Sequence, residues 1–226
     1  MKRLLILILV SAALWSGYWL YGASASKSAF AAWFAERRAD GWVADYAALD
    51  VQGFPNRFDT TFTDLSLADP DTGWAWDAPF FQLLALSYKP NHVIAIWPDS
   101  QRIATPQGRF DLTQAETQAS VVLWPSTDLA LDRVRLVADT AQMTASDGST
   151  TAASALRLAA ERLGPDGQAA TTAPAPGPTR YRIALSAEGF APDTALRQRI
   201  DPGDRLHRTL DALRADVTLT FDRPWD

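Results

Sequence analysis

The sequence predicts a mostly β protein of the α+β class. We expect an N-terminal membrane helix, then a strongly twisted antiparallel meander sheet, open or partly rolled, covered by a few helices. Two observations predict this fold. The chain begins with an uncharged apolar run of helical length, and from residue 43 short alternating segments are separated by turn signals about every 8–12 residues. No crossover helices interrupt residues 43–145, which argues against a parallel sheet.

The composition narrows the classes of function. With 226 residues, 47% hydrophobic and 21% charged, most of the chain should be globular. The net charge of −5 gives no electrostatic reason to expect a nucleic-acid partner. The absence of cysteine excludes disulfides, thiolate metal sites and a cysteine nucleophile, and two histidines are too few for a histidine-rich metal site. We expect no cofactor and no metal.

The N-terminal run has the features of a membrane anchor. Lys2 and Arg3 precede residues 4–21, which carry no charge. As a helix this run would be about 27 Å long at ~1.5 Å per residue, close to the ~30 Å hydrocarbon core of a bilayer. Aromatic residues cluster at its far end, where an interfacial belt would lie: Trp15, Tyr18, Trp19 and Tyr21.

A cleaved signal peptide is the alternative, because Ala23, Ser24 and Ala25 form a small-x-small cleavage site. Both interpretations divide the chain into residues 1–25, an anchor or signal peptide, and residues 26–226, a single β-rich extracytoplasmic domain. The first places the protein in the inner membrane with its body in the periplasm. The second releases the body to the periplasm after cleavage near Ala25.

Residues 27–39 predict a helix, because Phe30, Trp33 and Phe34 follow helical spacing. This aromatic stripe either packs on the sheet or lies in the membrane interface. Alternation then predicts ten strands and, between Phe62 and Leu65, a phase slip that fits a β-bulge. The ten are 44–52, 57–67, 74–77, 80–88, 92–97, 102–105, 108–114, 117–124, 129–138 and 140–145.

The C-terminal third returns to helical spacing. Helices are expected at 151–163 and, in two stretches of 193–214, at 193–200 and 203–214. Residues 164–179 are rich in Pro, Ala and Gly and predict a flexible loop. The remaining strands are expected at 181–187 and 217–221. Together with 27–39, the expected helices would cover one face of the sheet.

Familiar catalytic motifs are absent: no nucleophile elbow, phosphate-binding loop, dinucleotide glycine motif or His-Glu-x-x-His occurs. His92 and His207 are expected on the surface. Asp69, Asp71 and Asp99 lack the ligand ladder of a calcium loop, so plain turns are the simpler interpretation. Asp64 and Asp77 could act as an acid and base pair, but nothing in the sequence places them together.

Aromatic and aliphatic content stands out instead. The segment 80–88 has apolar side chains on both faces, which requires cover on both. Either both faces are core, or one lines a groove for a lipid or acyl chain. The candidate groove residues are Trp74, Trp76, Phe81, Leu84 and Trp97.

Several short pieces resemble, in their order, an uncharacterised bacterial family of membrane-anchored envelope proteins, a domain of unknown function. They are the N-terminal anchor, Gly53-Phe54-Pro55 with Arg57-Phe58, Trp76-Asp77-Ala78-Pro79, residues 106–108 and residues 217–222. The resemblance covers most of the chain and implies export or membrane attachment, with no catalytic residues to transfer. Its members run longer, so a C-terminal part is expected to be missing. The family is distantly similar to AsmA-type β-rich envelope proteins, which are linked to lipid movement.

These features predict a non-enzymatic membrane-anchored envelope protein that binds or shields a lipid or other apolar ligand on the concave sheet face. Its partners would be the membrane and a lipid. The alternative is a scaffold that recruits envelope proteins through an exposed edge strand. A hydrolase acting through Asp residues is a third hypothesis.

Overall fold

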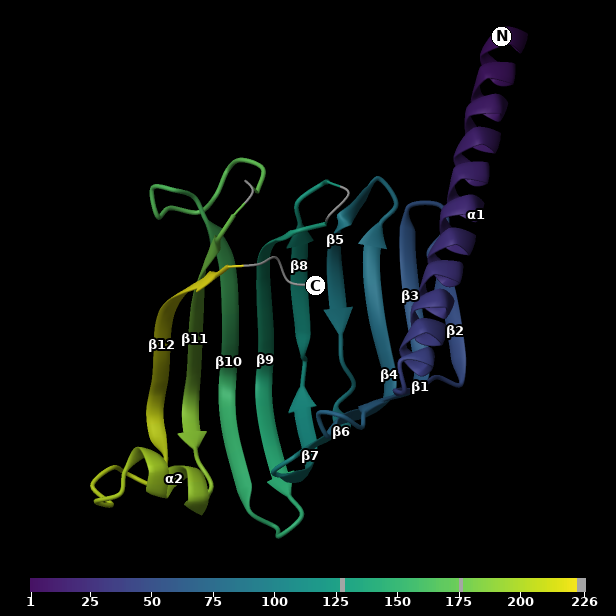
Figure 1. Ribbon diagram of the computed structural model, residues 1–226. Coiled ribbons are helices and arrows are strands. Elements are labelled where there is room, and N and C mark those ends of the chain that lie inside the picture. Colours follow the sequence, from purple (N-terminus) through teal and green to yellow (C-terminus); the bar gives the residue numbers. More distant parts are fainter. Residues whose placement is uncertain (127–128, 175–176, 223–226) are drawn as a thin grey trace.

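The computed structural model describes residues 1–126, 129–174 and 177–222. One antiparallel sheet contains twelve strands, with a long helix at one edge and a short helix near the other (Figure 1). The elements are α1 (Lys2–Ala39), β1 (Val43–Asp45), β2 (Ala48–Gln52), β3 (Arg57–Asp69), β4 (Trp74–Leu86), β5 (Lys89–Ile96), β6 (Ser100–Thr105), β7 (Gly108–Ala115), β8 (Gln118–Leu123), β9 (Leu131–Ala145), β10 (Thr150–Leu163), β11 (Thr179–Ala191), α2 (Thr194–Ile200) and β12 (Leu210–Phe221).

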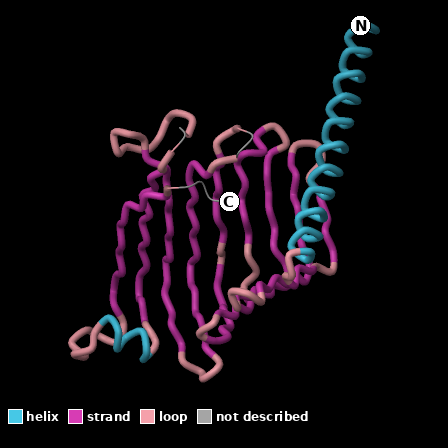
Figure 2. The backbone as a smooth tube through the Cα atoms, viewed as in Figure 1, coloured by secondary structure: helices cyan, strands magenta, loops and turns pink. Residues whose placement is uncertain are grey.

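The helix α1 is continuous, so the expected anchor and the helix at 27–39 form one rod. Its C-terminal half contacts β1, β2 and β3, where Phe30 and Phe34 pack edge-on and tilted against Phe62. Its N-terminal part extends past the end of the sheet (Figure 2), and the apolar side chains of residues 4–14 are exposed. The aromatic stripe therefore packs on the sheet, which was the first of the two interpretations of residues 27–39.

The sheet is a meander with two interrupted strand positions. The strands β5 and β6 lie end to end along β4, and β8 and β7 lie end to end along β9. Two pairs of expected strands are instead single strands, because β4 runs through 74–86 and β9 through 131–145. The expected strand 44–52 is divided into β1 and β2. The sheet curves without its edges meeting (Figure 1).

A row of irregular residues crosses the sheet where these interruptions occur. Asp64, Glu116 and Ala155 have φ values of 48°, 51° and 47°, in the left-handed region. By strand register, Asp64 lies opposite Pro79, while Glu116 and Ala155 flank Asp139. We call these five residues the phase-shift row. Beyond it, the alternation of each strand resumes in the opposite phase.

The phase-shift row explains the slip between Phe62 and Leu65, which both face the core. The predicted bulge is wrong, however. Thr63 pairs with Phe80 and Leu65 with Ala78, so the register is the same on both sides of Asp64 and no residue is inserted.

The expected helix at 151–163 is also wrong: these residues belong to β10, paired with β9 and β11. The helix at 203–214 is wrong as well, since β12 begins at Leu210 and residues before it form turns and bends. The helix at 193–200 is confirmed as α2, where the carboxylate of Asp193 accepts a hydrogen bond from the amide of Leu196 at 2.8 Å. The expected helical cover from 151–163 and 203–214 is therefore missing.

The two faces of the sheet differ in chemistry. Directly paired residues of antiparallel strands share a face. On one face, a row of eight such neighbours from β3 to β12 is apolar throughout: Phe58, Ala85, Val93, Val121, Val134, Ala160, Ile183 and Val217. On the other face, the adjacent row is mostly polar: His92, Val122, Arg133, Glu161, Arg182 and Thr218.

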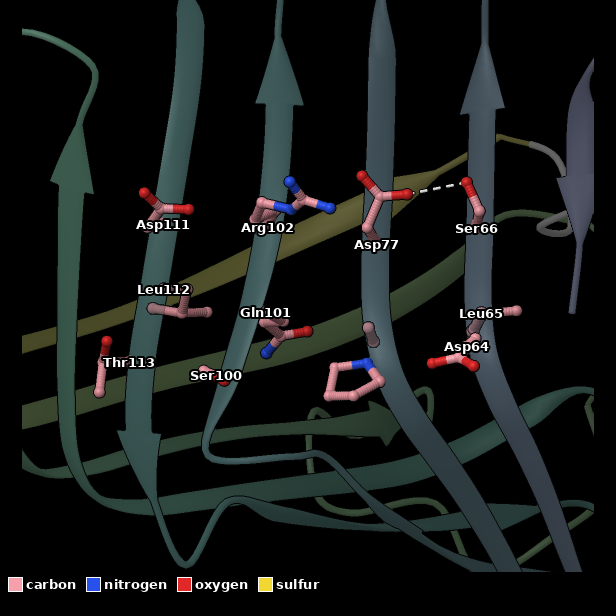
Figure 3. Close-up of a pocket in the computed structure, with 12 residues that line it drawn as sticks. Asp64, Leu65, Ser66, Asp77, Ser100, Gln101, Arg102, Asp111, Leu112 and Thr113 are labelled. Atoms are coloured by element: carbon pink, nitrogen blue, oxygen red, sulfur yellow. Dashed lines mark hydrogen bonds between the residues drawn. The ribbon is translucent and has the colours of Figure 1, made fainter. Parts of the chain in front are cut away.

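The apolar face is the concave one. In Figure 1 it faces the reader, with α1 and the β11–β12 edge nearer than the middle strands. In the opposite view of Figure 3, strands from the far part of the sheet pass behind β3, β4, β6 and β7. Within the described residues, the backbone of each strand lies close only to its neighbours in the sheet, and the backbone of α1 lies close only to β1, β2 and β3. Most of the concave face is therefore a single uncovered layer.

Candidate functional site

Four of the five predicted groove residues lie together. Trp74, Trp76, Phe81 and Trp97 line one hollow of about 660 Å³ on the concave face, with Trp42, Ile103 and Leu112 among its other walls. The Phe81 ring lies 5.3 Å from that of Trp76 and 5.2 Å from that of Trp97. The indole N–H of Trp76 donates to the side-chain oxygen of Gln101, so its polar atom is satisfied.

A second apolar hollow of about 360 Å³ adjoins the first beside α1. Leu67, Trp76 and Phe81 line both, so the two hollows share a wall. Phe30, Trp33 and Phe34 of α1 close this end. We call these two adjoining hollows the apolar trough, which extends on the concave face from α1 to Ile103 of β6 and Leu112 of β7.

Leu84 does not belong to this site. It lies on the convex face, in a polar hollow with Asp50, Arg57 and Asp59. The reason is strand alternation: Phe81 and Leu83 face the trough, so Leu84 faces the other way. The expectation that Leu84 lines the groove is therefore wrong.

The carboxylates considered for acid–base chemistry lie on the convex face. Asp64 and Asp77 line a hollow of about 540 Å³ with Arg102 and Asp111. In Figure 3, Asp77 accepts a hydrogen bond from the hydroxyl of Ser66 at 2.8 Å, whereas Asp64 lies farther along its strand. Ser66, Asp77, Arg102 and Asp111 are successive cross-strand neighbours, an arrangement that alternates charge across a sheet surface.

Two of the other polar candidates, Asp69 and His92, have side-chain partners. The Asp69 carboxylate accepts hydrogen bonds from the hydroxyl of Thr72 at 2.6 Å and from the backbone amide of Asp71 at 3.0 Å. The hydrogen bond from Thr72 lowers the pKa of Asp69. Asp69 therefore closes its own turn. The Nε2 atom of His92 lies 2.8 Å from the hydroxyl oxygen of Ser120.

The sequence did not reveal a buried polar cluster that lies on the concave face near the C-terminal end of β10. Arg162 is only 5% exposed; it pairs with Asp132 at 3.2 Å and donates to the carbonyl of Thr172 at 2.6 Å. Its guanidinium lies 5.4 Å above the ring of Trp124. Burial raises the pKa of the neighbouring Tyr181, whose hydroxyl donates to the carbonyl of Leu131 at 2.8 Å. The cluster ties part of the 164–179 segment to the sheet; residues 175–176 of that segment lie outside the described residues.

The helix α1 is hydrogen-bonded to one end of the sheet. Trp15 and Trp19 donate from their indole N–H groups to the carbonyls of Pro55 and Arg57, at 3.0 and 2.7 Å. The hydroxyl of Tyr18 donates to the carbonyl of Ser87 at 2.6 Å. We call the β2–β3 turn (53–56) and the β4–β5 turn (87–88) together the rim, the end of the sheet past which α1 continues.

The helix α1 is long and apolar enough to cross a membrane, and a signal sequence near an N-terminus passes the same test.

A family model described as an uncharacterized protein conserved in bacteria, DUF2125, matches residues 19–226. The chain belongs to the DUF2125 family. No curated protein and no solved structure matches the chain significantly. The expected membership of an uncharacterised bacterial family is confirmed, whereas the similarity to AsmA-type proteins is not shown. The family match begins at Trp19, before the candidate cleavage site at Ala25.

Proposed function

We propose that this DUF2125 protein binds a lipid non-enzymatically, with the acyl chains on the concave apolar face. One observation carries the proposal: a continuous apolar row runs from Phe58 to Val217, and beyond β3 no helix among the described residues lies over it. Contiguous exposed apolar surface on a soluble body is costly and marks a site of interaction.

The shape of the face favours a flexible chain over a compact ligand. The apolar trough has walls of Trp76, Phe81 and Leu67 and lies on the concave face. The polar side chains in its walls are already hydrogen-bonded to other wall residues: Gln101 accepts from Trp76, and Asp69 accepts from Thr72. A ligand held here must therefore bind through apolar contact, as an acyl chain does.

The helix α1 would keep the protein on the membrane that supplies the lipid. Trp19 is only 8% exposed and packs against Phe54 and Phe58. Cleavage at Ala25 would remove the ring contacts that Trp19 makes with Phe54 and Phe58, so we propose that α1 is a retained anchor. Lys2 and Arg3 favour a cytoplasmic N-terminus and a periplasmic body.

A scaffold that recruits envelope proteins is the second candidate. Its support is the edge strand β12, which pairs with β11 alone among the described strands. An edge strand offers free backbone groups to a partner strand. The lipid proposal is preferred because the apolar face extends across the sheet and not only along this edge.

The test compares two neighbours in β8. Val121 lies on the concave apolar row and Val122 on the convex face, and both are half-buried. Native mass spectrometry of protein from its own membranes in mild detergent should show a co-purifying lipid for the wild type and Val122→Asp. Val121→Asp should lose it, because a carboxylate on the apolar face penalises acyl contact. Equal lipid occupancy in two folded variants would contradict the proposal.

A further inference from the structure

We propose that the rim, formed by the β2–β3 and β4–β5 turns, inserts into the leaflet on the body's side of the membrane, with Phe54 and Tyr88 as its interfacial anchors. The partner is the lipid surface itself. This inference rests on α1 crossing the membrane and is independent of the lipid groove.

The length of α1 leads to this geometry. From Arg3 to Trp15 the helix rises about 18 Å at ~1.5 Å per residue, well short of a ~30 Å hydrocarbon core. Trp15 is bonded to the carbonyl of Pro55, so the β2–β3 turn is held at the depth of Trp15. With Arg3 at the opposite boundary, this turn cannot lie outside the membrane unless the bilayer thins by more than a third.

The hydrogen bonds of the rim suit a lipid environment. A backbone carbonyl inserted among lipids needs an internal donor, since water is scarce there. The carbonyls of Pro55, Arg57 and Ser87 each accept a hydrogen bond from an aromatic side chain of α1. Trp15, Tyr18 and Trp19 thus satisfy polar groups at the rim while presenting apolar rings.

The exposed side chains of the rim are those that favour a membrane interface. Phe54 is 57% exposed and Tyr88 is 66% exposed, and both project from turns that flank α1. Aromatic rings are typical of the headgroup boundary, and Lys89 beside Tyr88 can extend its ammonium toward the headgroups. The net charge of −5 gives no general attraction to anionic lipids, so insertion must depend on these rings.

The test measures depth at defined positions. The chain has no cysteine, so single substitutions can each carry one environment-sensitive fluorophore. The full chain is reconstituted in vesicles of phosphatidylethanolamine and phosphatidylglycerol with brominated acyl chains, which quench probes among the lipids. The positions are Phe54→Cys and Tyr88→Cys at the rim, Ser146→Cys in the turn at the opposite end of the sheet, and Ile8→Cys in the exposed part of α1.

The two rim probes should be blue-shifted and quenched at a depth of about 12 Å, because Trp15 lies about 18 Å from Arg3 in a ~30 Å hydrocarbon core. The Ser146 probe should behave as in water, and the Ile8 probe should be quenched most strongly. A deep Ile8 probe with water-exposed rim probes would overturn the inference and leave the anchor intact. Water-exposed probes at both sites would overturn the inference and the anchor together. Rim probes shielded from water but not quenched would also overturn it, because protein and not lipid would then cover the rim.

Discussion

Substitution of Gly22 tests whether α1 remains docked on the mature protein. A Cβ atom at Gly22 would lie 2.5 Å from the ring of Phe58, whereas a Cβ at Gly17 would meet nothing within 4 Å. In an exposed helix, Gly→Ala stabilises by about 1 kcal/mol. At Gly22 the clash should cost about 1–3 kcal/mol, because the Phe58 ring also packs on Trp19 and cannot move freely.

Gly17→Ala should therefore be neutral or stabilising by up to about 1 kcal/mol, and Gly22→Ala destabilising by up to about 2 kcal/mol. The assay is denaturant unfolding of the full-length protein in mild detergent, followed by tryptophan fluorescence. The intact mass of each sample shows whether residues 1–25 are present. Equal midpoints for the two variants would refute the docking of α1 on Phe58, and a mass lacking residues 1–25 would refute the retained anchor.

Two further predictions concern the β9–β12 part of the sheet. Arg162→Leu should lower the free energy of unfolding by about 3 kcal/mol in chemical denaturation. This is the lower end expected for breaking a buried ion pair, because the Asp132 side chain is 18% exposed. The control is Arg133→Leu, at an exposed arginine of the same sheet, which should change the free energy of unfolding by no more than about 0.5 kcal/mol. The bond from Arg182 lowers the pKa of Asp216 in the folded state, so its contribution is present above the ordinary Asp pKa of about 3.9 and is lost as pH falls through the lowered value. Asp216→Asn should accordingly reduce the acid dependence of stability below about pH 4, and an unchanged acid limb would count against this pairing.

The antiparallel meander could be predicted from alternation and turn residues. The helix wrongly predicted at 151–163 could not be recognised as a strand from the sequence alone. The reason is Ala155, whose positive φ reverses the alternation within β10. Ala153 and Leu156 then share the concave side three residues apart, a spacing that also indicates a helix. The left-handed backbone conformation of one alanine cannot be recognised from the residue types around it.

The C-terminal error has a different cause. The spacing of Leu206 and Leu210 fits a helix, yet the carbonyls of Leu206 and His207 accept hydrogen bonds from Arg197. These contacts, with the Arg197–Asp204 ion pair, hold the chain in a turn before β12. Such contacts between α2 and the following segment depend on tertiary structure, which local periodicity does not report.

The sequence predicted the apolar character of the candidate site, but it could not tell on which face of the sheet each residue lies. Aromatic content selected Trp74, Trp76, Phe81 and Trp97, which the structure places around one hollow. Leu84 was included because the segment 80–88 is apolar on both faces, and only strand pairing shows that Leu84 lies with Asp59 on the convex face. The contacts of Trp15, Tyr18 and Trp19 with the rim were likewise beyond sequence reasoning, since they join residues about 40–70 positions apart.

The most direct measurement of the central claim is photo-crosslinking with a lipid that carries a photoactivatable acyl chain. The protein is labelled in its own membranes, and tandem mass spectrometry locates the modified residues. The account predicts adducts on the concave row, at Val93, Val121 and Val134, and none on their convex neighbours His92, Val122 and Arg133. Adducts spread equally over both faces, or confined to residues 1–21 of α1, would contradict a lipid-binding concave face.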